Sequence, residues 1–118
     1  MYAIEFYETV SGRSDTYDYL EGLEKSARSN KKDKVQFKKI VGHMRLLQTT
    51  GTAVGFPYVR YLGDDIWELR PGADRFLFFV NKDENKYVIL LHFVKQSRKT
   101  PKNEMETAKK RRADYLER

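Results

Sequence analysis

Cysteine is absent from the 118 residues of this chain, and histidine occurs only twice, at His43 and His92. The absence of cysteine excludes a disulfide framework, a thiolate metal site and a cysteine nucleophile. Two histidines so far apart argue against a zinc site, and we expect neither a metal nor a cofactor. Long apolar runs are also missing, and the N-terminus alternates instead of resembling a signal peptide. We therefore expect a cytoplasmic protein without a membrane-spanning segment.

The length and composition predict one folded domain that covers residues 1–118. A chain of 118 residues is long enough for one domain and too short for two. Apolar residues make up 40% of the chain and aromatic residues 14%, so a core can form. Because tyrosine, phenylalanine and tryptophan supply much of that core, the composition favours strands over a purely helical bundle.

The positive charge of the chain is concentrated in two stretches. The formal net charge is +6 and the calculated pI is about 9.5. Residues 1–24 carry six acids and one arginine, whereas residues 28–45 carry seven basic residues and residues 95–112 carry eight. If folding gathers the two basic stretches into one field, that field will attract polyanions such as nucleic acid. The alternative is an ordinary solvated surface rich in lysine.

Hydrophobic periodicity predicts an α+β fold. Alternation predicts a first strand over residues 2–7. Helical spacing predicts one helix that begins at Ser14 and is broken at Ser29-Asn30, and a second helix from about Lys32 to Gln48. Further strands are predicted over residues 59–62, 66–70, 75–80 and 87–94, and a last helix begins at Thr100-Pro101. The expected architecture is a strand and a helix hairpin, an antiparallel sheet of four to five strands in all, and a C-terminal helix.

The strongest candidate site spans the turn at Pro71-Gly72. Side chains alternate between the faces of a strand, so Glu68 and Arg70 share one face of the strand before the turn. Arg75 begins the strand after the turn. Arginine presents a planar fork of donors that matches phosphate oxygens, so this arrangement predicts a phosphate-binding site. The alternative is that one arginine forms a structural ion pair with Glu68 or Asp74.

Two residues could handle protons at such a site. Glu68 is either a general base or the ion-pair partner of an arginine, and the sequence favours the ion pair slightly. His92 lies in the apolar run from Tyr87 to Val94 and is either a core histidine or, because it is close to the end of that strand, a catalytic group.

The basic segment after that strand is a second source of phosphate ligands. Lys95, Arg98 and Lys99 leave the strand and lead into the last helix. On a loop at the end of the sheet, they could bind a backbone phosphate or neutralise charge that develops on it. The alternative is that they serve only solubility.

These residues, taken in order, resemble the RelE/ParE toxin superfamily. The segments that carry the resemblance are Trp67-Glu68-Leu69-Arg70, Asp74-Arg75 at the head of an aromatic strand, Leu90-Leu91-His92-Phe93 with Lys95, and Lys99-Thr100-Pro101 at the start of a helix. Each motif is weak by itself, but their order and spacing extend over nearly the whole chain. The similarity is greatest to the phage-derived, HigB-like branch.

The resemblance implies a fold and an activity. Members fold as a twisted antiparallel sheet with an N-terminal helix hairpin and a C-terminal helix. They are toxins of type II toxin–antitoxin pairs, and RelE-like members cleave mRNA on the ribosome without a metal ion. The ribose 2′-hydroxyl attacks the adjacent phosphate and leaves a 2′,3′-cyclic phosphate. The implied partners are the ribosome, mRNA and a helix-turn-helix antitoxin (HigA-like). Two alternatives remain: a ParE-like DNA gyrase inhibitor and a non-enzymatic nucleic-acid-binding module.

The resemblance also suggests roles for individual residues. Arg75 and Arg70 match basic positions of the family and are expected to bind the scissile phosphate, with Lys95 as a third catalytic cation. Glu68 departs from the lysine of the best-studied RelE-type enzymes, and with His92 it is a candidate for proton transfer. The residues expected to contact RNA or the ribosome are Arg98, Lys99, Lys38, Lys39 and Arg45.

Overall fold

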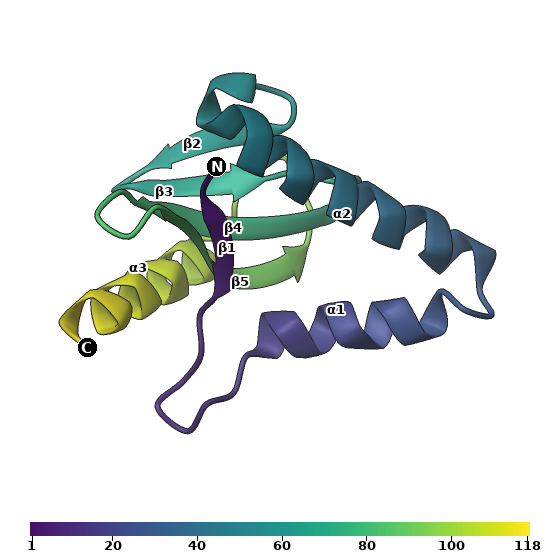
Figure 1. The fold of residues 1–118 in the computed structure, drawn as a ribbon, viewed down its shortest axis with the longest axis horizontal. Helices are drawn as coiled ribbons and strands as arrows, with labels where there is room; N and C mark the ends of the chain where they lie inside the picture. The colour runs from purple at the N-terminus through teal and green to yellow at the C-terminus, as the bar shows by residue number, and fades with distance from the viewer.

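A mixed five-stranded sheet forms the centre of the computed structural model, which describes residues 1–118. Along the chain the elements are β1 (Ala3–Phe6), α1 (Asp15–Ser26), α2 (Lys31–Thr50), the 3-10 helix η1 (Gly51–Val54), β2 (Val59–Gly63), β3 (Ile66–Leu69), β4 (Asp74–Asn81), β5 (Lys86–Val94) and α3 (Lys102–Glu117). The spatial order of the strands is β1-β5-β4-β3-β2 (Figure 1). The predicted α+β class is confirmed, with its first strand, helix hairpin and C-terminal helix. No helix is both long and apolar enough to cross a bilayer.

The first strand is the exception to the predicted antiparallel sheet. β1 pairs with β5 in parallel, whereas the other three strand pairs are antiparallel. A tight turn forces the next strand to run back beside the previous one. No such turn follows β1, because the helix hairpin intervenes before the next strand. Its direction is therefore free of that constraint, and the sheet is mixed.

Local sequence signals set the ends of the helix hairpin. The Ser14 hydroxyl accepts a hydrogen bond from the Tyr17 backbone N–H at 3.1 Å and caps α1. The Asn30 side chain accepts one from the Asp33 N–H at 3.1 Å and caps α2. Each cap satisfies one of the free N–H groups of a first helical turn. Gly51 ends α2 with a φ of 73°, a conformation that favours glycine.

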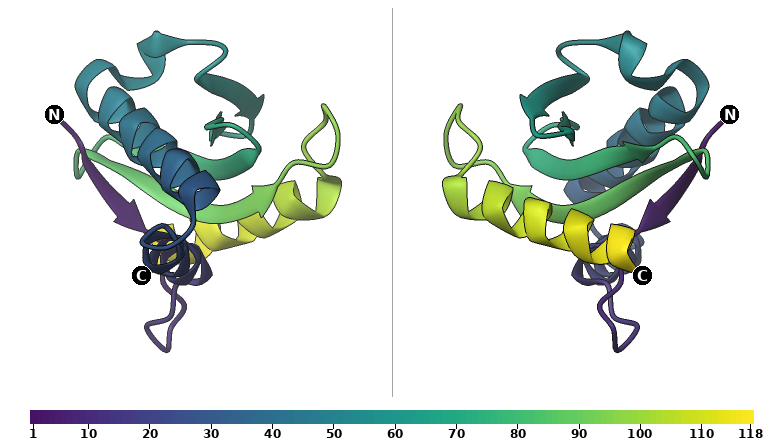
Figure 2. Two further views of the ribbon diagram at one scale, coloured as in Figure 1. Left: turned by 90° about the vertical axis from the view of Figure 1, so that its right-hand side faces the viewer. Right: turned by 90° about the vertical axis from the view of Figure 1, so that its left-hand side faces the viewer.

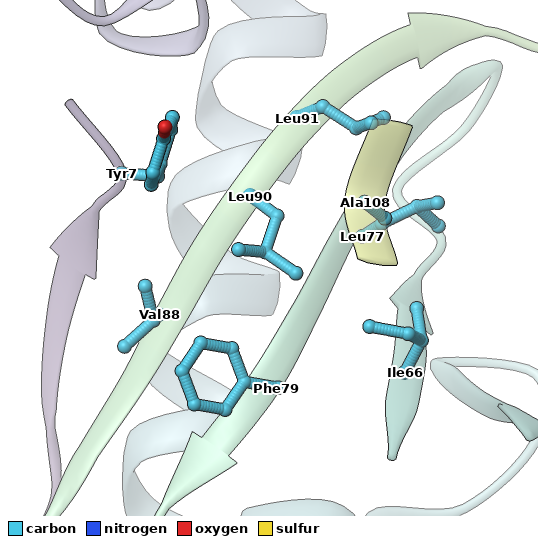
Figure 3. Packing of buried hydrophobic residues seen from close by; sticks show 8 residues of the cluster. All are labelled: Tyr7, Ile66, Leu77, Phe79, Val88, Leu90, Leu91 and Ala108. Carbon is cyan, nitrogen blue, oxygen red and sulfur yellow. The ribbon is translucent and has the colours of Figure 1, made fainter. Parts of the chain in front are cut away.

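The sheet separates two hydrophobic clusters. Ile40 and Leu47 of α2 pack on one face, together with partly buried residues of α1. Ala108 of α3 packs on the other face against the cluster that contains Leu77 and Phe79 (Figure 3). Figure 2 shows α2 above the sheet and α3 below it. Because Ala108 is fully buried and small, α3 can lie close to the strands.

A β-bulge in β5 determines on which face of the sheet the last side chains of this strand lie. The pairing of β4 with β5 shifts between Leu77 and Phe78, and Leu90 has no partner on β4. This is a β-bulge, which places one extra residue in one strand of a pair. Leu90 and Leu91 therefore both belong to the cluster on the α3 side. After the bulge the alternation is inverted, so His92 faces the helix hairpin.

Candidate functional site

Five cationic side chains from three parts of the chain line one open pocket of about 590 Å³, here called the cationic pocket. Its lining residues are Phe56, Arg60, Arg70, Arg75, Lys95, Gln96, Ser97 and Arg98. They come from β2 and the loop before it, from both sides of the β3–β4 turn, and from the loop after β5. That last loop stands across the end of the sheet from the chain that leads into β2 (Figure 2). The pocket contains four of the residues expected from the sequence: Arg70, Arg75, Lys95 and Arg98.

Arg75 is held by the backbone of the turn that precedes it. Its Nη1 donates to the carbonyl of Gly72 at 2.7 Å and to that of Asp74 at 2.9 Å. The residue is only 6% exposed. Nε and Nη2 donate to no protein group, and neither atom is sealed from solvent. Burial lowers the pKa of the Arg75 guanidinium, and the positive charges of Arg70 and Arg60 lower it further. An anion bound in the pocket would offset this repulsion and stabilise the charged form of all three arginines.

Glu68 is the buried anion beneath these cations. Its side chain is 2% exposed and does not line the pocket. It accepts a hydrogen bond from Arg70 at 3.1 Å and from the Thr100 hydroxyl at 2.9 Å, and it lies 3.3 Å from an Arg60 nitrogen. Both carboxylate oxygens are thus engaged. The geometry is that of the ion pair considered in the sequence analysis, and it fixes the guanidinium of Arg70 at the pocket.

Arg60 is a pocket residue that was not among those predicted from the sequence. It lies in β2, where it pairs directly with Glu68 of β3. Residues opposite one another in a sheet share a face, so this register places Arg60 beside Arg70. The only signal in the sequence was the basic residue in the short predicted strand over residues 59–62. Without the strand register, nothing connected that residue with the site.

His92 lies apart from the cationic pocket. Its Nε2 is 2.6 Å from an Asp74 carboxylate oxygen, and its ring stacks on that of Tyr19 of α1 with 3.8 Å between centroids. It does not line the pocket. The bulge in β5 places it on the side of the sheet that the helix hairpin covers, whereas Arg75 pairs with Phe93 and faces the other side. The structure therefore does not bring the predicted proton carrier to the arginines.

The loop after β5 is fastened to the turn that carries the arginines. The Lys95 backbone N–H donates to the carbonyl of Ala73 at 2.9 Å. The Thr100 hydroxyl, at the other end of the loop, donates to Glu68. Lys95 and Arg98 are exposed on this loop and line the pocket, whereas Lys99 is exposed without lining it. The loop thus supplies two exposed cations to a site where hydrogen bonds hold Arg70 and Arg75.

A family profile, that of the phage-derived protein Gp49-like family (DUF891), matches residues 18–113. The chain belongs to the Gp49-like family. The match extends from α1 into α3 and includes every residue of the cationic pocket. No curated protein sequence matches the chain. The Gp49-like family is a RelE-like toxin family associated with toxin–antitoxin systems. The predicted relationship to RelE-like toxins is therefore confirmed, and the HigB-like branch stays a prediction.

The other basic residues of this Gp49-like protein lie outside the pocket. Lys38, Lys39 and Arg45 are exposed on α2, on the other side of the sheet from α3. The basic run of α3 is largely neutralised within the molecule. Its ion pairs are Lys109 with Asp64 at 2.9 Å, Arg111 with Asp15 at 2.8 Å and Arg112 with Asp65 at 3.2 Å. The free positive field is therefore narrower than the basic stretches of the sequence suggest.

We expect the Glu68→Gln variant of this Gp49-like protein to lose about 2 kcal/mol of unfolding free energy. The neutral amide can still accept a hydrogen bond, but Arg60 and Arg70 lose the charge that compensates them. Urea denaturation at neutral pH measures the loss. Glu24→Gln, at an exposed acid of α1, is the matched control and should leave the midpoint unchanged. A wild-type midpoint in Glu68→Gln would show that the buried pair contributes nothing to stability.

Proposed function

We propose that this chain is the toxin of a type II toxin–antitoxin pair, of the HigB-like type, and that it cleaves mRNA on the ribosome. The observation that carries the proposal is the cationic pocket, where five cations line one open hollow above a single buried carboxylate. Cations gathered at this density repel one another, so an anionic ligand stabilises the arrangement. The Gp49-like family and its association with toxins support the same conclusion.

The proposed reaction needs no group from outside the RNA as nucleophile. The ribose 2′-oxygen attacks the adjacent phosphorus, the bond from phosphorus to the 5′-oxygen breaks, and the products are a 2′,3′-cyclic phosphate and a 5′-hydroxyl. Arg75, through Nε and Nη2, and Arg70 bind the non-bridging oxygens and stabilise the charge that grows on them. Arg98 adds to that field from the loop.

Proton transfer is assigned to Lys95 in this proposal. Neither a carboxylate nor an imidazole lines the pocket. Glu68 is engaged with Arg60, Arg70 and Thr100, and His92 lies on the other side of the sheet. Neither residue is therefore placed to transfer a proton at the pocket. A lysine ammonium can donate a proton to a leaving oxygen. Lys95 would protonate the departing 5′-oxygen, and solvent would take the proton from the 2′-hydroxyl.

The proposed partners follow from the activity. The ribosome presents single-stranded mRNA, and a helix-turn-helix antitoxin (HigA-like) would silence the toxin. The exposed cations outside the pocket, Lys99, Lys38, Lys39 and Arg45, are proposed to contact ribosomal RNA. The site of action would be the cytoplasm.

Mapping of mRNA 5′ ends tests the proposed activity. After induction of the protein in growing bacteria, we expect new ends that carry a 5′-hydroxyl and are phased to codons. The same cuts should form in a purified system only when ribosomes translate the message. Double-strand DNA breaks without mRNA cuts would instead support a ParE-like gyrase inhibitor. Unchanged growth would support the non-enzymatic nucleic-acid-binding module.

A further inference from the structure

Phe56 is an exposed aromatic residue at the edge of the cationic pocket. It is 70% exposed, although the side chain is large and apolar. It is also the only hydrophobic residue among those that line the pocket. An isolated exposed apolar side chain is ordinary, but this one lies among five cations, where water and ions would otherwise fill the space. A ligand that fits this position would therefore have both an anionic part and a flat apolar part.

The backbone around Phe56 forms a tight turn, and Arg70 lies over one part of its ring. The backbone N–H groups of Tyr58 and Val59 both donate to the carbonyl of Gly55 at 3.0 Å, which closes a tight turn around Phe56. The guanidinium carbon of Arg70 lies 4.9 Å from the ring centroid. Arg70 is itself fixed by Glu68. An anchored cation thus covers part of the ring, and most of the rest faces solvent.

We propose that Phe56 is a stacking platform for a base of the RNA whose phosphate occupies the pocket. The inference rests on the proposed function and adds a base-binding position to the same site. Only an unpaired base can use that position, because paired bases in a duplex are not free to stack on a side chain. Aromatic side chains stack on unpaired bases with little dependence on sequence. A nucleotide that binds Arg70 and Arg75 through its phosphate places its base, across the ribose, within reach of Phe56.

Binding of two fluorescent oligonucleotides tests the platform. The first is a single-stranded 2′-O-methyl RNA hexanucleotide, which cannot be cleaved because its 2′-oxygen is capped. The second has the same backbone without bases. By fluorescence anisotropy, we expect the wild-type protein to bind the base-bearing probe about tenfold more tightly than the abasic probe. Phe56→Ala should remove that difference and keep the affinity for the abasic probe, and Phe56→Trp should retain the difference.

Tyr58→Ala is the matched control for Phe56→Ala. Tyr58 is also exposed and belongs to the same loop, but its ring packs near His43 and does not line the pocket. The Tyr58→Ala protein should bind both probes as the wild type does. Equal binding of the two probes by the wild type, or a persisting difference in Phe56→Ala, would overturn the inference. Thermal melting of each variant checks the fold.

The binding test separates this inference from the proposed nuclease. Neither probe is a substrate, so the assay does not require cleavage. A protein that discriminates between the probes but leaves translated mRNA intact has the platform and lacks the nuclease activity. A protein that cuts mRNA at codons, while Phe56→Ala still discriminates, has the activity and lacks the platform.

Discussion

Replacing Arg75 by alanine is expected to abolish growth arrest and to lower single-turnover cleavage of ribosome-bound mRNA by about a hundredfold or more. Arg75 is held by the carbonyls of Gly72 and Asp74 and keeps two donor nitrogens for the pocket. Arg70 does not replace the two lost donors, because its Nη1 is already bound to Glu68 and its guanidinium has a position of its own in the pocket. Cleavage is measured with purified protein and ribosomes that carry a defined message, by primer extension over time.

Two further variants serve as controls for Arg75→Ala. Arg75→Lys keeps the charge but loses the planar fork, so it should recover only part of the rate. Arg112→Ala removes a partly buried arginine that pairs with Asp65 and does not line the cationic pocket, and it should leave cleavage unchanged. Melting temperatures show whether each protein remains folded. Wild-type cleavage by a folded Arg75→Ala protein would remove Arg75 from the mechanism.

Replacing Asp74 by alanine is expected to cost about 3 kcal/mol of unfolding free energy. Asp74 is 4% exposed. Its carboxylate binds the Tyr19 hydroxyl at 2.8 Å, the His92 Nε2 at 2.6 Å and the Gln36 Nε2 at 2.6 Å. Alanine leaves the partly buried Tyr19 hydroxyl and His92 Nε2 without their acceptor, whereas Gln36 Nε2 keeps its hydrogen bond to the Pro71 carbonyl. Urea denaturation measures the loss, and Asp83→Ala, at an exposed turn, is the control.

The contribution of Asp74 should also depend on pH. Burial raises the pKa of its carboxyl, but the hydrogen bonds from His92, Tyr19 and Gln36 outweigh burial and hold the pKa below its usual value. A carboxyl with a lowered folded-state pKa stabilises the fold above its unfolded pKa of about 4 and loses that effect as the pH falls through the folded value. The difference between wild type and Asp74→Ala should therefore shrink in acid. A difference that stays constant down to pH values of about 2 would contradict this assignment.

Much of the site was accessible from the sequence because it depends on local rules. Alternation placed Glu68 and Arg70 on one face, and the ion pair between them confirms that placement. The short turn after Arg70 brought Arg75 to the same end of the sheet, and both line the pocket. Turn length and strand periodicity are local properties, so a single sequence is enough to infer them.

The parts that were missed depend on strand irregularities and on contacts between distant segments. Arg60 lies opposite Glu68 in the β2–β3 hairpin, whose pairing is shifted between Tyr61 and Gly63, and strand alternation by itself does not predict that shift. The pairs between α3 and the acids at Asp15, Asp64 and Asp65 join residues far apart in the chain. Counting charges along the sequence therefore overestimated the free charge of the last helix.

The bulge at Leu90 determines which residue of β5 lies opposite Arg75. With uninterrupted pairing between β4 and β5, Arg75 would lie opposite His92, whereas it lies opposite Phe93. The sequence does not reveal this bulge, because the residues on both sides of Leu90 are apolar and would be buried in either register. A single inserted residue thus separates this pocket, which is lined by arginine and lysine, from one in which an imidazole would lie opposite Arg75. Insertions and deletions, and not only substitutions, can therefore change which side chain of a strand reaches a pocket in this fold.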